Sequence, residues 1–122
     1  MRVPLEGLHV LVVEDDPELR ALTELILEEE GGVVRGFSLG MEAIRSLDEF
    51  TPQVALLDSR LPDTTGVALG RELAARHPDC VQVLVSGDTD GLYEWKSRGH
   101  LALPKPYEID DLVELVRAAA GR

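Results

Sequence analysis

Acidic, hydroxyl and ammonium side chains follow closely after the short apolar runs of this 122-residue chain. They occur at four separate places, namely Glu14-Asp15-Asp16, Asp58, Ser86 and Lys105. If the apolar runs form parallel strands, their carboxyl ends meet at one edge of the sheet, which is where such sheets bind ligands. We therefore expect these side chains to gather at a single site.

The expected cluster is rich in carboxylates. Carboxylates that crowd together disfavour one another's ionised form unless a cation lies among them. Mg²⁺ suits such a site because it prefers a few carboxylate oxygens, several waters and a phosphate oxygen. No histidine or cysteine belongs to the cluster, so zinc is disfavoured.

Each position also has an ordinary structural explanation. Asp16 precedes Pro17 and is better explained as a helix cap, because proline loses no hydrogen bond at the first helical position. The other acids could be solvated charge at a strand end, the serine a turn residue and the lysine a loop charge. The functional interpretation is favoured because independent causes would not place all of them at successive strand ends.

The apolar runs themselves indicate a buried parallel sheet. They are short, continuous and rich in valine and leucine, as expected for strands covered on both faces. The clearest runs are 10–13, 54–57 and 83–85, and two weaker ones are 33–37 and 101–103.

Helical patterns separate these runs. Apolar residues recur at helical spacing from Pro17 until the glycines at 31–32, and again over 41–49, 65–76 and 108–120. Between the serine and the lysine the sequence favours only a short or irregular helix near 91–97. Strands and helices that alternate five times predict one open α/β domain with right-handed crossovers.

Composition supports a globular domain and excludes some functions. The chain is 44% hydrophobic and 29% charged, with a net charge of −11. This acidity argues against direct binding to nucleic acid or to an anionic membrane. No signal-peptide core or membrane-spanning run is present, so we expect a cytoplasmic protein. The single cysteine, Cys80, allows no internal disulfide.

Four segments resemble the motifs of response-regulator receiver domains, the phosphoacceptor domains of two-component signal transduction. They read VLVVEDD at 10–16, ALLDSRLPDTTG at 55–66, VLVSG at 83–87 and LPKPY at 103–107. Each motif is weak alone, whereas four in order along the chain are strong evidence. The resemblance implies one receiver domain over 1–122, with a doubly wound five-stranded parallel sheet in the flavodoxin-like order 2-1-3-4-5.

The resemblance also implies a role for each acid of the cluster. Asp58 would be the phosphorylated nucleophile and would also bind Mg²⁺. Asp15 would bind the ion directly, and Glu14 directly or through water. The backbone carbonyl of Arg60 would supply a further metal ligand.

The remaining motif residues would handle the phosphoryl group. Ser86 would donate a hydrogen bond to one phosphoryl oxygen, and Lys105 would pair with another oxygen or with Asp58. The peptide bond between Lys105 and Pro106 would be cis. The phosphoryl donor would be a sensor histidine kinase or a histidine phosphotransfer protein, and the output would be altered partner binding by a monomer or weak homodimer. An effector or kinase domain could be linked outside this chain.

Two features depart from the family pattern. The stretch between the serine and the lysine is shorter than usual, and the position of a frequent switch aromatic is Ala102. Trp95 or Tyr93 could substitute for that ring. The opposite charges of Arg60 and Asp88 also suggest an ion pair across the mouth of the site.

Several other functions compete with the receiver interpretation. A haloacid-dehalogenase-type phosphohydrolase would need a second aspartate at the position of Arg60. A flavodoxin-like cofactor binder would need a phosphate-cradling loop where Glu14-Asp15-Asp16 stands, and acids there would repel phosphate. A degenerate receiver that serves only as a docking module, or the receiver piece of a hybrid histidine kinase, stays open.

Overall fold

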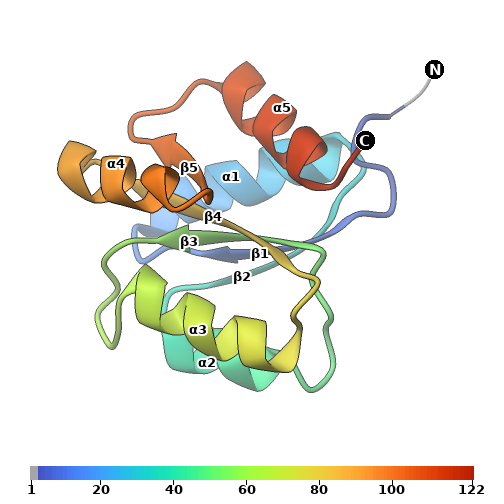
Figure 1. Cartoon of the computed structure of the whole chain (residues 1–122). Helices are drawn as coiled ribbons and strands as arrows, with labels where there is room; N and C mark the ends of the chain where they lie inside the picture. Colours follow the sequence, from blue (N-terminus) through green and yellow to red (C-terminus); the bar gives the residue numbers. More distant parts are fainter. Residues whose placement is uncertain (1–2) are drawn as a thin grey trace.

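The computed structural model describes residues 3–122, which form alternating strands and helices around one sheet (Figure 1). The elements are β1 His9–Val13, α1 Pro17–Glu29, β2 Val33–Phe37, α2 Gly40–Ser46, β3 Val54–Asp58, α3 Gly66–Arg76, β4 Val81–Ser86, α4 Thr89–Ser97, β5 Leu101–Pro104 and α5 Ile109–Ala119. All paired strands are parallel, in the order β2-β1-β3-β4-β5. The predicted strand order is therefore confirmed.

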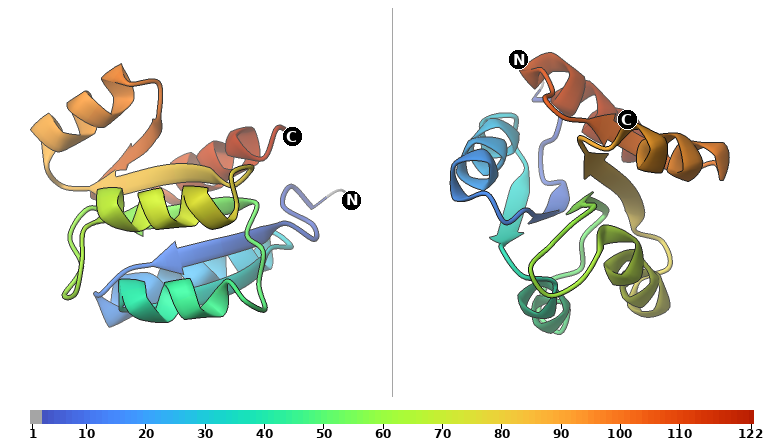
Figure 2. Two further views of the ribbon diagram at one scale, coloured as in Figure 1. Left: turned by 60° about the horizontal axis from the view of Figure 1, so that its bottom comes forward. Right: turned by 90° about the vertical axis from the view of Figure 1, so that its left-hand side faces the viewer.

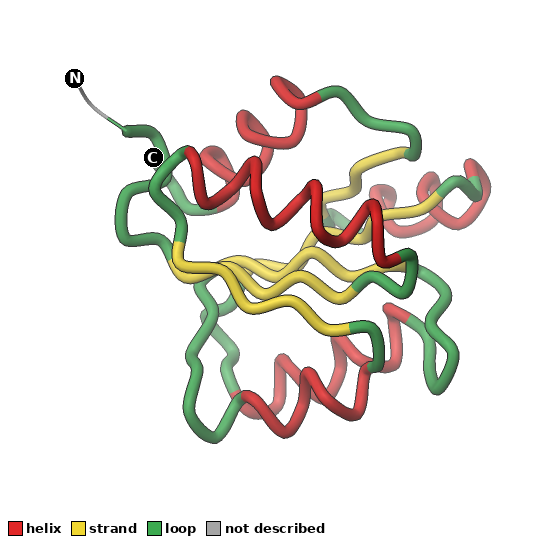
Figure 3. Tube along the Cα trace, turned by 180° about the vertical axis from the view of Figure 1, so that it is seen from behind, coloured by secondary structure: helices red, strands yellow, loops and turns green. Residues whose placement is uncertain are grey.

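Helices cover both faces of this sheet (Figure 3). α1 and α5 contact each other on one face, and α2 and α3 contact each other on the opposite face. α4 packs against β4 and β5 near the edge of the sheet (Figure 2). Crossovers on both faces make this a doubly wound α/β fold, as predicted.

β1 carries side chains into two apolar cores. Val10 and Val12 belong to the core that includes residues of α1 and α5, whereas Leu11 and Val13 belong to the core shared with α2 and α3. Successive side chains of a strand point to opposite faces of the sheet. A strand covered by helices on both faces therefore needs an unbroken apolar run, which is what the sequence shows.

Two of the predicted helices, α3 and α5, have bounds within one residue of expectation, but α2 is shorter than predicted. It ends at Ser46 rather than at 49. Leu47 and Glu49 donate their backbone N–H groups to the carbonyls of Ile44 and Ser46, three residues back. Hydrogen bonds with three-residue spacing form a tighter turn than those of the α-helix. The chain therefore continues beyond α2 in short turns of the 3₁₀ type.

The fourth helix is short, and it is regular rather than unwound. It begins at Thr89, two residues before the predicted start, in spite of Gly91. Tertiary contacts stabilise it: Leu92 is buried, and the indole N–H of Trp95 donates to the carbonyl of Leu101 at 2.6 Å. Packing of this kind, rather than helix propensity, gives most helices in proteins their stability.

Within residues 3–122, no helix combines the length and the apolarity needed to cross a bilayer. The longest, α1, has 13 residues, whereas a spanning helix needs about 20.

Candidate functional site

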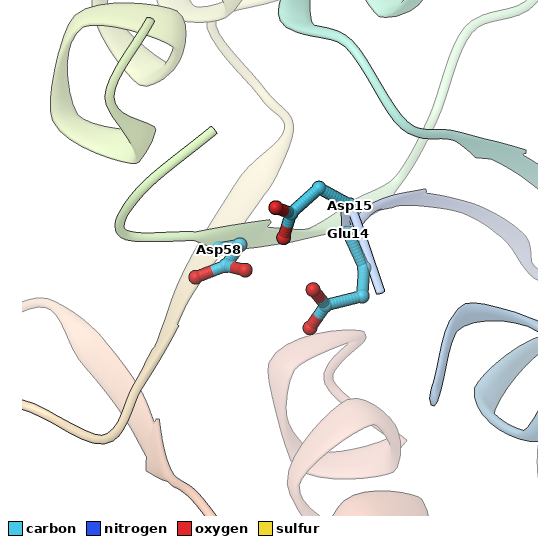
Figure 4. A group of neighbouring side chains, drawn as sticks. All are labelled: Glu14, Asp15 and Asp58. Atoms are coloured by element: carbon cyan, nitrogen blue, oxygen red, sulfur yellow. The ribbon is translucent and has the colours of Figure 1, made fainter. Parts of the chain in front are cut away.

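Three carboxylates meet at the carboxyl ends of β1 and β3 (Figure 4). Glu14 and Asp15 follow β1, Asp58 ends β3, and one carboxylate oxygen from each lies within 4.8 Å of the others. The parallel register places Val13 opposite Leu57, so the residues that follow them, Glu14 and Asp58, leave the sheet side by side. Glu14 and Asp58 are buried, whereas Asp15 is exposed.

Lys105 adds an ammonium group to the three acids. Its Nζ lies 2.6 Å from Oε1 of Glu14 and donates to Oδ2 of Asp58 at 3.2 Å. The backbone N–H of Lys105 donates to the carbonyl of Ser86, which ties this loop to β4. The peptide bond between Lys105 and Pro106 is cis, as predicted.

Burial and charge shift the protonation of this cluster. Burial raises the pKa of Glu14 to about 7, with the Asp58 side chain adding to the rise and Lys105 opposing it. Burial acts to lower the pKa of Lys105, but the hydrogen bonds to Glu14 and Asp58 outweigh it and the pKa is raised. The ammonium therefore stays charged between the two buried acids.

Ser86 ends β4 beside β3, and its hydroxyl is already engaged. Its Oγ accepts hydrogen bonds from the Ser59 hydroxyl at 2.7 Å and from the Asp88 N–H at 2.9 Å. Sequence reasoning missed Ser59. Its signal is only that a hydroxyl residue directly follows Asp58 as the chain leaves β3.

The predicted ion pair between Arg60 and Asp88 is wrong, because no ion pair joins them in the part of the chain that the structure describes. Asp88 directly precedes α4, and its carboxylate lies against Gly91 in the first turn, 3.0 Å from where a Cβ would stand. The Arg60 side chain is exposed, while its backbone N–H donates to Oδ1 of Asp58 at 3.3 Å. The metal-binding role of the Arg60 carbonyl stays a prediction.

The substitution of Trp95 or Tyr93 for a ring at position 102 stays a prediction. Tyr93 is 76% exposed. Trp95 stacks on His100, with ring centroids 4.3 Å apart, and bonds to the backbone of β5. A different aromatic, Tyr107, lies beside the acids, and its hydroxyl forms a 2.6 Å hydrogen bond with Thr23 of α1.

The acids that flank the cluster cap helices. Asp16 accepts the N–H groups of Glu18 and Leu19 at the start of α1, which confirms its interpretation as a cap. Asp63 accepts the N–H groups of Gly40 and Met41 at the start of α2, and these bonds lower the pKa of Asp63. Neither acid belongs to the cluster of Figure 4.

Gly66 is packed against the backbone that carries Asp58. A Cβ at this position would stand 2.5 Å from the Asp58 carbonyl oxygen and 2.8 Å from Cδ1 of Leu84. We expect Gly66→Ala to lower the free energy of unfolding by about 1–3 kcal/mol, the usual cost of overpacking. Urea denaturation measures this cost. Gly87→Ala is the control, because a Cβ there meets nothing within 4 Å; equal stability of the two variants would contradict the prediction.

Comparison with known proteins points to one family. The model of the response regulator receiver domain family matches residues 10–117. The DNA-binding transcriptional regulator NtrC of Escherichia coli K12 is 33% identical over 113 residues, which cover 90% of this chain and 24% of NtrC. This chain therefore spans about a quarter of that relative's length.

Solved structures agree with that match. The receiver domain of the sensor histidine kinase PA1611 from Pseudomonas aeruginosa PAO1, which has a magnesium ion coordinated in its active-site cleft, has a TM-score of 0.82 at 25% identity and covers 95% of this chain and 99% of that one. A CheY-like receiver domain protein from Methanospirillum hungatei JF-1 has the same fold, with a TM-score of 0.85 at 24% identity and 95% coverage of both chains. With the family model matching most of its 122 residues, this chain belongs to the response regulator receiver domain family.

Proposed function

We propose that residues 1–122 form one cytoplasmic receiver domain that accepts a phosphoryl group on Asp58 from a sensor histidine kinase or histidine phosphotransfer protein. Altered partner binding then relays the signal. The observation that carries the proposal is the contact of the buried Asp58 carboxylate with Lys105, beside two further carboxylates. This arrangement combines a nucleophile, a fixed cation and a set of hard oxygen ligands.

Mg²⁺ fits the acid cluster. Three carboxylate oxygens lie within 4.8 Å of one another, and a single ammonium group contacts two of these acids, so the cluster keeps a net negative charge. Glu14, Asp15, Asp58 and the backbone carbonyl of Arg60 would hold the ion, which prefers oxygen ligands of this kind. When bound, Mg²⁺ supplies neutralisation of the charge on the phosphoryl oxygens.

The chain's own side chains would promote phosphoryl transfer by their position and charge. Asp58 attacks phosphorus in line, a bond between its carboxylate oxygen and phosphorus forms, and the bond to the histidine nitrogen of the donor breaks. Lys105 offsets charge on one phosphoryl oxygen, and the Ser86 hydroxyl donates a hydrogen bond to another. Phosphoryl transfer depends mainly on such positioning and electrostatic stabilisation.

Intact-mass measurement after incubation with Mg²⁺ and phosphoramidate tests the proposal. We expect a phosphate-sized gain that chelation with EDTA prevents and that hydroxylamine reverses, because hydroxylamine cleaves acyl phosphates but leaves phosphoserine intact. No gain with any small donor would favour the competing function, a receiver that serves only as a docking module.

Magnesium should also stabilise the fold. At ten times its dissociation constant, Mg²⁺ is expected to add about 1.4 kcal/mol to the free energy of unfolding, measured as a rise in melting temperature. Asp15→Asn should lose most of this rise, because it removes one charged ligand. Asp16→Asn, which makes the same charge change at a helix cap, should keep it. Equal responses of the two variants would contradict the assigned ligand.

A further inference from the structure

We infer that Ser59 is a positioning residue, which holds the Ser86 hydroxyl in place to donate to a phosphoryl oxygen. The inference rests on the proposed function and adds a residue to it. The starting observation is the 2.7 Å hydrogen bond from the Ser59 hydroxyl to the Ser86 Oγ. Ser86 is 3% exposed, so this contact lies where a lost hydrogen bond is not replaced by bulk water.

The Ser59 backbone is anchored on two sides. Its N–H donates to the carbonyl of Val85 in β4 at 3.0 Å, and its carbonyl accepts the N–H of Gly66, the first residue of α3, at 3.1 Å. Register pairing places Asp58 opposite Val85, so the next residues, Ser59 and Ser86, are cross-strand neighbours. The Ser59 hydroxyl therefore reaches Ser86 from a fixed point next to the phosphoacceptor.

The Ser86 hydroxyl still has its own proton available to donate in a hydrogen bond. A serine hydroxyl can accept two hydrogen bonds and donate one. The Ser86 Oγ accepts from the Ser59 hydroxyl and from the Asp88 N–H, so both acceptor positions are filled and its own proton is free to be donated. A phosphoryl oxygen can only accept, and bonds received by a hydroxyl strengthen the bond that it gives.

Removal of the Ser59 hydroxyl should leave Ser86 less well oriented. With one acceptor position empty, the Ser86 side chain can rotate, and only the Asp88 N–H still holds it. The proposed ligands of Mg²⁺ do not include Ser59, and Ser59 acts on the phosphoryl group only through Ser86. The loss should therefore fall on the rate at saturating donor and not on the donor concentration that gives half of that rate.

Phosphoryl uptake from phosphoramidate, followed by intact mass, tests the inference in four proteins: wild type, Ser59→Ala, Ser86→Ala and the double variant. We expect Ser59→Ala to lower the saturated rate about twofold to tenfold, the range that corresponds to one neutral hydrogen bond. In the Ser86→Ala background the same change should have no further effect, because Ser59 acts only through Ser86. Ser59→Thr, which keeps the hydroxyl, should restore the rate.

Fluorescence of Trp95, the single tryptophan, serves as a control for folding. Trp95 and Ser59 line the same groove of about 330 Å³ between α3 and α4, so an unchanged spectrum shows that the groove is intact. If Ser59→Ala unfolds, Ser59→Cys keeps the side-chain volume with a much weaker donor and should show the same loss.

The inference is overturned if Ser59→Ala and Ser59→Cys leave the saturated rate unchanged, or if the loss is as large in the Ser86→Ala background. Failure of the proposed function looks different, because the wild-type protein would then gain no phosphate from any donor.

Discussion

Replacement of Asp58 by asparagine is expected to abolish the hydroxylamine-sensitive mass gain completely. Asparagine has nearly the same size and can still accept a hydrogen bond from Lys105, which donates to Oδ2 of Asp58 at 3.2 Å. Its neutral amide, however, has no carboxylate oxygen with which to form an acyl phosphate. The change therefore removes the nucleophile while it preserves the packing of a residue that is 7% exposed.

Asp63→Asn is the matched control, with the same charge change five residues further along the chain. The Asp63 carboxylate caps α2 through the N–H groups of Gly40 and Met41 and does not belong to the acid cluster. We expect this variant to gain phosphate as the wild-type protein does. A hydroxylamine-sensitive gain that persisted in Asp58→Asn would assign the phosphoryl group to another carboxylate, and the proposed role of Asp58 would be withdrawn.

The acid cluster could be predicted because parallel strands end together. A strand that is buried on both faces of the sheet needs an unbroken run of apolar residues. The end of such a run therefore marks the end of the strand in the sequence. Glu14 and Asp58 were found in this way, and the register of β1 with β3 brings them together. Lys105 was found by the same reasoning applied to β5, and its Nζ contacts both acids.

What could not be predicted depends on side-chain direction. Charge alone suggested a pair between Arg60 and Asp88, yet the backbone at the start of α4 directs the Asp88 carboxylate to Gly91. The regularity of α4 also depends on tertiary contacts, such as the bond from Trp95 to Leu101, which no local propensity encodes. The contact between Ser59 and Ser86 arises because the carboxyl ends of β3 and β4 lie side by side. A single hydroxyl residue forms no pattern in the sequence from which this contact could be predicted.

These contacts also bear on how the site could reach the rest of the molecule without an aromatic ring at position 102. Ser86 is hydrogen-bonded both to Ser59, which lines the groove between α3 and α4, and to Asp88, which directly precedes α4. A phosphoryl group that accepts a hydrogen bond from the Ser86 hydroxyl therefore acts on a residue that already contacts the start of α4. The Ala102 position is not needed for that contact.

Lys105→Gln is expected to lower the rate of phosphoryl uptake by about a hundredfold to a thousandfold, the usual cost of removing one fixed group that stabilises charge in the transition state. Within residues 3–122, Lys105 is the one cation that forms an ion pair with the carboxylates of Glu14 and Asp58. Its ammonium lies where charge on the phosphoryl oxygens would develop, and glutamine keeps much of the side-chain length without the charge.

The chain's only other lysine, Lys96, supplies the matched control, because it is exposed on α4. Lys96→Gln should leave the initial rate of mass gain with phosphoramidate and Mg²⁺ unchanged. Lys105→Arg keeps the charge but presents a planar fork in place of a compact ammonium, so we expect a loss smaller than that of Lys105→Gln. A group that neutralises charge on the transferring phosphoryl group cannot be removed without slowing the transfer. A wild-type rate in Lys105→Gln would therefore contradict this role and leave Lys105 only the structural role of holding Glu14 and Asp58 together.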